Sequence, residues 1–175
     1  ATVPGTVYAA DAQPQPQPLA LPPALPTPKD VPYGGTIALH VDATDLNRHI
    51  LSMNETVPVP QDIAANGGDF VLLYPMWLPG DHSPTGTIDQ LGGLNVRADG
   101  KVVSWVRDTV TVSAFHIQVP KGTKELKVAY QLLTPVSSKE GRVVMTDAMV
   151  NVQWSAVSLY PAGYFTRQIM VKPQV

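Results

Sequence analysis

The sequence contains no cysteine in its 175 residues. This absence excludes a disulfide framework, a thiol nucleophile and any metal site that depends on cysteine. Charged residues are scarce as well, since they make up 15% of the chain, against about a quarter in a typical globular protein. The 12 basic and 14 acidic residues give a net charge of −2. No basic excess is available to neutralise a phosphate backbone, so we expect no nucleic-acid partner.

Several motifs are also missing. No apolar run approaches the roughly 18–20 residues that cross a bilayer, so no membrane span is expected. The four histidines are His40, His49, His82 and His116, and none belongs to the His-Glu-x-x-His pattern that holds zinc on a helix. His40 and His116 fall on the polar phase of strand patterns, which predicts surface or cross-strand positions. We therefore expect no catalytic, cofactor-binding or metal-binding residue in this segment.

Proline is the abundant residue, and half of it lies near the N-terminus. Nine of the 18 prolines fall within residues 1–32, where residues 13–18 alternate glutamine with proline. Proline removes backbone donors and biases the preceding residue toward extended geometry, which favours polyproline II structure. We interpret residues 1–32 as an extended leader, either a tether or an arm lying over the domain surface. Its Ala10-Asp11-Ala12 step has the small-x-small pattern of a signal-peptidase site, which favours a periplasmic or secreted protein.

From Thr36 onward the apolar residues follow a period of two, which indicates half-buried strands. Asp99-Gly100 between two such runs is a strong hairpin signal. The run at 110–119 is expected to form a strand that pairs with 126–132, and residues 60–65 are compatible with one helical turn. Further strand-like runs lie at 36–42, 48–59, 70–74, 94–97, 101–105, 143–145, 150–159 and 165–171. Residues 33–175 therefore predict an all-β domain of roughly eight to ten strands, an antiparallel β-sandwich or a large curved sheet.

The most distinctive segment is the loop at residues 74–84, which reads Tyr-Pro-Met-Trp-Leu-Pro-Gly-Asp-His-Ser-Pro. Pro79-Gly80 suits a tight turn, because proline fixes φ and glycine supplies a positive φ. Two interpretations remain open. Either Trp77 closes the open end of the sheet and the loop is simply rigid, or the rigid loop presents Asp81 and His82 to a neighbouring domain or a cleft.

The pattern Tyr-Pro-x-Trp-x-Pro-Gly after an apolar strand resembles the N-terminal domain of the glycyl aminopeptidase family. These proteins are zinc metallopeptidases of the gluzincin type that usually carry a PDZ domain. The resemblance covers residues 33–175, and similar segments follow in order at 37–43, 77–80, 104–105, 115–117, 126–130, 151–154 and 159–163.

The resemblance implies a multidomain enzyme whose zinc ligands and catalytic glutamate lie after this chain. It also implies that the β domain packs on a thermolysin-like catalytic domain of the same protein and can line its cleft. Zinc is then the cofactor of the parent enzyme and a peptide is its substrate, while this segment alone is expected to be inactive. Loop chemistry and motif position give six candidate interdomain or cleft-lining residues, namely Trp77, Asp81, His82, Arg142, Asn151 and Trp154.

Two other functions remain open at this stage. The chain could be a stand-alone β-sandwich module that binds carbohydrate or protein, with Trp77, Trp105 and Trp154 forming a stacking platform. It could also be a structural assembly domain whose edge strand or apolar face mates with another copy.

Overall fold

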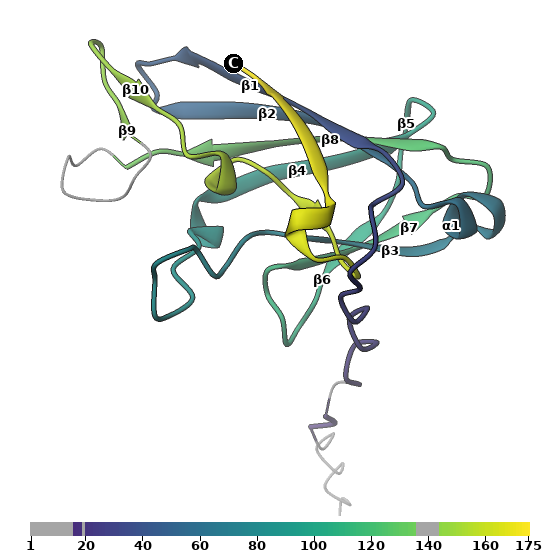
Figure 1. The fold of residues 1–175 in the computed structure, drawn as a ribbon. Helices are drawn as coiled ribbons and strands as arrows, with labels where there is room; N and C mark the ends of the chain where they lie inside the picture. The colour runs from purple at the N-terminus through teal and green to yellow at the C-terminus, as the bar shows by residue number, and fades with distance from the viewer. Residues whose placement is uncertain (1–15, 19, 136–143) are drawn as a thin grey trace, which may run out of the picture.

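The computed structural model describes residues 16–18, 20–135 and 144–175. In these ranges the chain forms β-strands in two larger sheets and one two-stranded ribbon, with a single α-helix (Figure 1), which confirms the all-β prediction. The strands are β1 (Thr36–Asp45), β2 (Ile50–Pro58), β3 (Gly68–Leu73), β4 (Leu91–Ala98), β5 (Lys101–Val102), β6 (Trp105–Arg107), β7 (Ala114–Val119), β8 (Glu125–Leu133), β9 (Val144–Met145), β10 (Val150–Asn151), β11 (Tyr160–Pro161) and β12 (Met170–Gln174). The helix α1 (Gln61–Asn66) is the helical turn expected near residue 60, and 3-10 turns lie at η1 (Ile88–Gln90), η2 (Trp154–Ala156) and η3 (Thr166–Gln168).

The two larger sheets pack face to face. One has the strand order β12-β1-β2-β8-β4-β5 and the other has the order β11-β3-β7-β6, and Figure 1 shows them as two layers. The period-two pattern explains the core, since alternate residues of each strand point between the layers. In β1 these are Ile37, Leu39 and Val41, which meet Phe115 and Ile117 of the facing sheet in one buried cluster.

The strand pairing differs in two ways from the sequence prediction. The strand β8 pairs with β2 and β4, whereas β7 pairs with β3 and β6. The predicted β7–β8 pairing is therefore wrong, because the connection at residues 120–124 crosses from one sheet to the other. In addition, β12 lies parallel to β1 at the sheet edge, while the other strand pairs are antiparallel. The Asp99-Gly100 hairpin is confirmed, with φ of 49° and 78° at these residues.

Several predicted strands are shorter than expected, and for the run at 110–119 the cause is a side chain that accepts backbone hydrogen bonds. The strand predicted at 110–119 begins only at Ala114, since the Asp108 carboxylate accepts hydrogen bonds from the N–H groups of Val110 and Thr111, both at 2.8 Å. Such bonding from an Asp side chain replaces a strand ladder with a turn. The run at 150–159 likewise contains only β10, after which the chain turns through η2.

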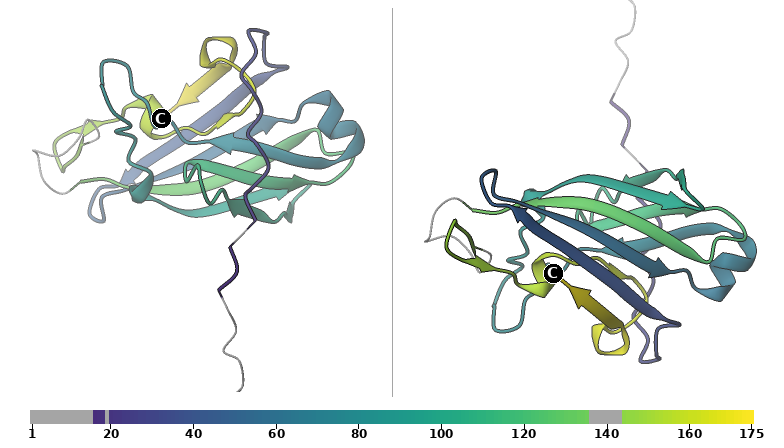
Figure 2. Two further views of the ribbon diagram at one scale, coloured as in Figure 1. Left: turned by 90° about the horizontal axis from the view of Figure 1, so that it is seen from below. Right: turned by 90° about the horizontal axis from the view of Figure 1, so that it is seen from above.

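The N-terminal arm crosses over the four-stranded sheet, and its first described residues extend away from the domain (Figure 2). Leu25 packs on the outer face of that sheet, against a small cluster of Val71, Ala114 and Ala162. Farther along, the backbone N–H of Lys29 donates to the Gly163 carbonyl at 3.1 Å. The arm is therefore attached to the domain by packing and by backbone hydrogen bonds. Among the described residues, no helix is long and apolar enough to span a membrane.

Candidate functional site

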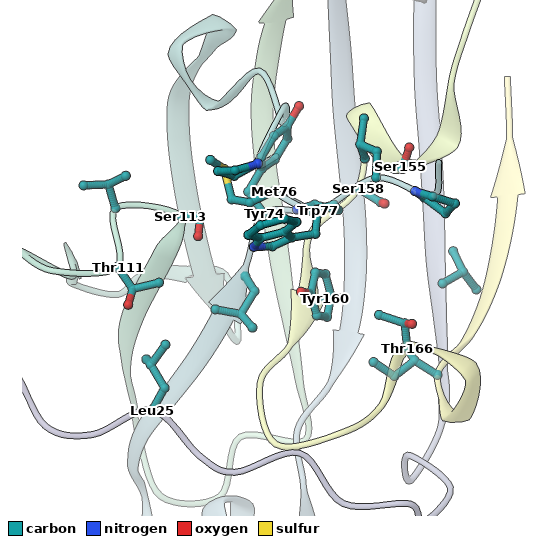
Figure 3. A pocket seen from close by; sticks show the side chains of 18 of the residues that line it. Leu25, Tyr74, Met76, Trp77, Thr111, Ser113, Ser155, Ser158, Tyr160 and Thr166 are labelled. Carbon is teal, nitrogen blue, oxygen red and sulfur yellow. The ribbon is translucent and has the colours of Figure 1, made fainter. Parts of the chain in front are cut away.

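A surface pocket of about 750 Å³ opens beside the 74–84 loop. Figure 3 shows Trp77 and Tyr160 near its centre, with Thr111 and Ser113 on one side and Ser155 and Ser158 on the other. The described residues that line it are apolar or carry hydroxyl groups, and none of them is charged. A smaller hollow of about 480 Å³ follows the arm and shares Leu25 and Tyr160 with the pocket. This surface suits an uncharged, largely apolar occupant rather than an ion.

The loop that carries Trp77 is folded back on itself. The N–H of Asp81 donates to the Leu78 carbonyl at 3.1 Å and Gly80 has a φ of 90°, which confirms the predicted Pro-Gly turn. The N–H of Gly86 donates to the Met76 carbonyl at 3.0 Å and so closes the base of the loop. These bonds present Trp77 outward, with 68% of its surface exposed. The interpretation of Trp77 as a plug for the sheet end is therefore wrong.

Buried polar side chains hold a second wall of the pocket. The hydroxyl of Tyr74 donates to the Ala156 carbonyl at 2.9 Å, and the hydroxyl of Tyr130 lies 2.8 Å from the Val157 carbonyl. The carboxyl of Glu55 accepts a hydrogen bond from the Leu159 N–H at 2.7 Å. The segment 156–159 is thus fixed by side chains that reach it from the sandwich interior.

A buried histidine supports the side of the pocket that Thr111 and Ser113 form. His116 points from β7 to the outer face of its sheet, where its Nε2 lies 3.1 Å from the Asp108 carboxylate. The sequence predicted a surface or cross-strand position for His116. The surface position is wrong, because His116 is buried, and its bond to Asp69 on β3 is a cross-strand contact. Asp108 also shapes the turn that leads into Thr111 and Ser113. Hydrogen bonds from the Thr111 N–H and then from His116 outweigh burial and hold the pKa of Asp108 below its usual value.

The structure separates the six candidate residues. Trp77 lines the pocket, and Trp154 begins η2 next to the pocket residue Ser155, with 42% of its surface exposed. Asp81 and His82 lie farther along the loop and do not line the pocket, and Asn151 lies exposed in β10. Arg142 lies outside the described residues. The hydroxyl-bearing lining residues were missed, because Ser and Thr in turns carry no signal that separates a pocket from a loop.

Trp105 has a different role from the other two tryptophans. Its ring packs edge-on against Phe115, with 5.6 Å between centroids, and its indole N–H donates to the Leu94 carbonyl at 3.2 Å. Trp105 is therefore occupied in packing the two sheets together. A stacking platform that includes all three tryptophans is not formed.

The residues that the structure describes do not form a binding site for zinc. Among them, no three His, Asp or Glu side chains gather in a group that could hold a metal ion. His116, which lies between Asp69 and Asp108, uses both ring nitrogens in hydrogen bonds to carboxylates. Those nitrogens carry protons and are not available as ligands.

The fold and the pocket define a two-sheet β domain with an exposed aromatic loop. Residues 38–175 match the Peptidase M61 N-terminal domain, and the chain belongs to that family. The fold is similar to the crystal structure of an aminopeptidase N family protein from Idiomarina loihiensis, with 18% identity and a TM-score of 0.55. That alignment covers 72% of this chain and 20% of the other, so this chain matches about a fifth of that protein. A comparison with curated proteins gives no match.

Proposed function

We propose that this chain is the N-terminal, non-catalytic β domain of an exported zinc aminopeptidase that removes glycine or other small N-terminal residues from peptides. The domain packs on a thermolysin-like catalytic domain of the same protein and shapes its substrate cleft. The observation that carries the proposal is the match of residues 38–175 to the M61 N-terminal domain.

The exposed aromatic loop supplies the surface for the catalytic domain. Trp77 is the most exposed of the three tryptophans, and Val110 and Val112 across the pocket are also exposed. Large aromatic residues beside an apolar pocket are typical anchors of protein interfaces. The lack of charge around the pocket favours an apolar partner surface, since a charged one would be desolvated without compensation. We assign the catalytic domain as the occupant of this face.

The enzymatic part of the proposal is tested with the parent protein and the 175-residue chain side by side. Each is purified without added metal, its zinc content is measured, and release of glycine from a glycyl anilide is followed. The expected result is zinc with chelator-sensitive turnover in the parent, and neither in the chain. Stoichiometric zinc with turnover in the chain alone would overturn the proposal.

The packing part is tested by substitution in the parent protein. Replacing Trp77 with alanine is expected to weaken the interdomain contact and to make the linker between the domains more sensitive to limited proteolysis. Val102→Ala is the matched control, because Val102 is also exposed but lies in β5, away from the pocket. Equal proteolysis of the two variants would show that the Trp77 face is not the contact.

A further inference from the structure

Glu55 is a carboxylic acid inside the sandwich core. It lies on the core-facing phase of β2, between Met53 and Val57, and only 1% of its surface is exposed. Its neighbours across the sheet are Leu39 on β1 and Val128 on β8. An ionised carboxylate in such surroundings is strongly disfavoured unless it is fully hydrogen-bonded. Glu55 is not, because its Oε2 is buried without a hydrogen-bond partner.

The hydrogen bonds of Glu55 depend on whether the acid is neutral or ionised. The hydroxyl oxygen of Tyr130 lies 2.5 Å from Oε1 of Glu55 and 2.8 Å from the Val157 carbonyl oxygen. Both distances are those of hydrogen bonds, and each bond needs one proton. The phenol supplies one proton and the carbonyl supplies none. If Glu55 is neutral, the second proton is its own, so that Oε1 donates to Tyr130 while Tyr130 donates to Val157; if Glu55 is ionised, Tyr130 donates to Oε1 instead.

The surroundings place the loss of this proton in the neutral pH range. Burial raises the pKa of Glu55 to about 7, although the bonds to Tyr130 and to the Leu159 N–H partly offset the rise. Burial also raises the pKa of Tyr130, so the phenol stays protonated. The other titratable groups nearby are Tyr74, whose hydroxyl binds the same segment, and Asp89, whose charge acts on Tyr74.

We propose that Glu55 is a proton-dependent latch on the segment 156–159. In the neutral acid, Tyr130 is free to hold the Val157 carbonyl. When Glu55 ionises, its carboxylate becomes the acceptor of the single hydrogen bond that the Tyr130 hydroxyl donates, and the Val157 carbonyl loses that donor. The segment is then held by fewer hydrogen bonds and becomes more mobile.

The latch acts on the pocket, because the segment and its flanks contribute part of the pocket wall. Ser155, Ser158 and Tyr160 all line the pocket, and Ser158 lies between the two residues that the Glu55–Tyr130 pair holds. Protonation inside the core therefore sets how firmly one wall of the exposed site is fixed. This inference concerns the 175-residue chain itself and does not rest on the function proposed above.

The experiment follows the titration of glutamate carboxyl groups by carbon NMR in the 175-residue chain. The chain has only three glutamates, Glu55, Glu125 and Glu140, so each signal can be assigned through its own side-chain carbons. The expected result is that the Glu55 carboxyl titrates near pH 7 and that the carbonyl carbon of Val157 shifts with the same midpoint. If Glu55 titrates near its ordinary value of 4.5, or if the Val157 carbonyl signal does not move with it, the proposal is overturned.

Two variants separate the latch from a general effect of pH. Glu55→Gln cannot titrate. Tyr130→Phe removes the hydroxyl group that donates to either Glu55 or the Val157 carbonyl. In both, the Val157 carbonyl signal is expected to stay constant between pH 6 and pH 8. A shift of the wild-type size in either folded variant would contradict the mechanism. The wild-type titration remains decisive if a variant fails to fold.

Discussion

His116 Nδ1 on β7 lies 2.7 Å from the Oδ2 of Asp69, a diagonal neighbour on the adjacent strand β3. The other ring nitrogen lies 3.1 Å from Asp108. Because a carboxylate can only accept, both ring nitrogens must donate, and the ring is a buried cation between two anions. This arrangement joins three elements: β3, β7 and the turn after β6.

We predict that His116 titrates above its ordinary pKa. Burial lowers the pKa, but the bonds to Asp69 and Asp108 outweigh it and raise the pKa above 6.5. The charged His116 therefore stabilises the folded state fully below pH 6.5, and this stabilisation is lost as the pH rises through the raised pKa. A proton NMR titration of the ring checks this. Asp108→Asn should lower the midpoint while still accepting bonds from the turn N–H groups, and a wild-type midpoint below 6.5 would contradict the cation.

Glu55 gives a second pH dependence in a different window. Its pKa rises on folding from 4.5 to about 7, so the unfolded chain loses this proton first as the pH increases. The free energy of unfolding is predicted to fall across that window by roughly 3 kcal/mol. Denaturant unfolding at a series of pH values measures the fall. In Glu55→Gln this part of the pH dependence should be absent, and an unchanged profile would show that Glu55 does not titrate as described.

The Gly86 position tests the base of the aromatic loop. A Cβ at Gly86 would lie 2.1 Å from the Pro75 carbonyl oxygen, so Gly86→Ala forces the backbone to move. We expect a loss of about 1–3 kcal/mol, typical of overpacking, together with a change in tryptophan fluorescence from Trp77. Gly92→Ala is the control, because a Cβ there meets nothing within 4 Å. Similar denaturation midpoints for the two variants would contradict the described loop.

The junction between the arm and the domain is predicted to contribute to stability through burial at Tyr33 rather than through charge at Asp30. Tyr33 is buried, its ring stands 5.0 Å from that of Tyr164, and its hydroxyl donates to the Pro58 carbonyl. Asp30 pairs with Arg167 at 2.5 Å, but both side chains are largely exposed. Tyr33→Ala should therefore lower the free energy of unfolding by about 3 kcal/mol or more, and Asp30→Ala by far less, because solvent screens an exposed ion pair. Equal losses would contradict this division.

The sequence was a good guide wherever neighbouring residues determine the structure. Alternating apolar residues located β1, β2 and β8, and Asp99-Gly100 located the hairpin between β4 and β5. Pairing across the sandwich was not predictable in the same way. The same alternation in β7 and β8 is compatible with one sheet or two, and only the packing of all strands decides it.

Two features of the site are visible in the sequence pattern. Glu55 occupies the same strand phase as Leu51, Met53 and Val57, so a carboxyl group on the apolar face of β2 was visible in the sequence. Asp108, placed just before Val110 and Thr111, likewise has the position of a side chain that caps a turn. The pocket itself could not be foreseen, because the loop 74–84, the segment 110–113 and the segment 155–160 meet only through tertiary packing.

The central claim is that the Trp77 face of this β domain packs on the catalytic domain of its parent enzyme. Hydroxyl-radical footprinting of tryptophan, read by mass spectrometry, tests it in the parent protein and in the isolated 175-residue chain. We predict that Trp77 is oxidised readily in the isolated chain, where it is 68% exposed, and is protected in the parent. Trp105, which packs against Phe115, should react equally in both. Equal oxidation of Trp77 in the two proteins would contradict the claim.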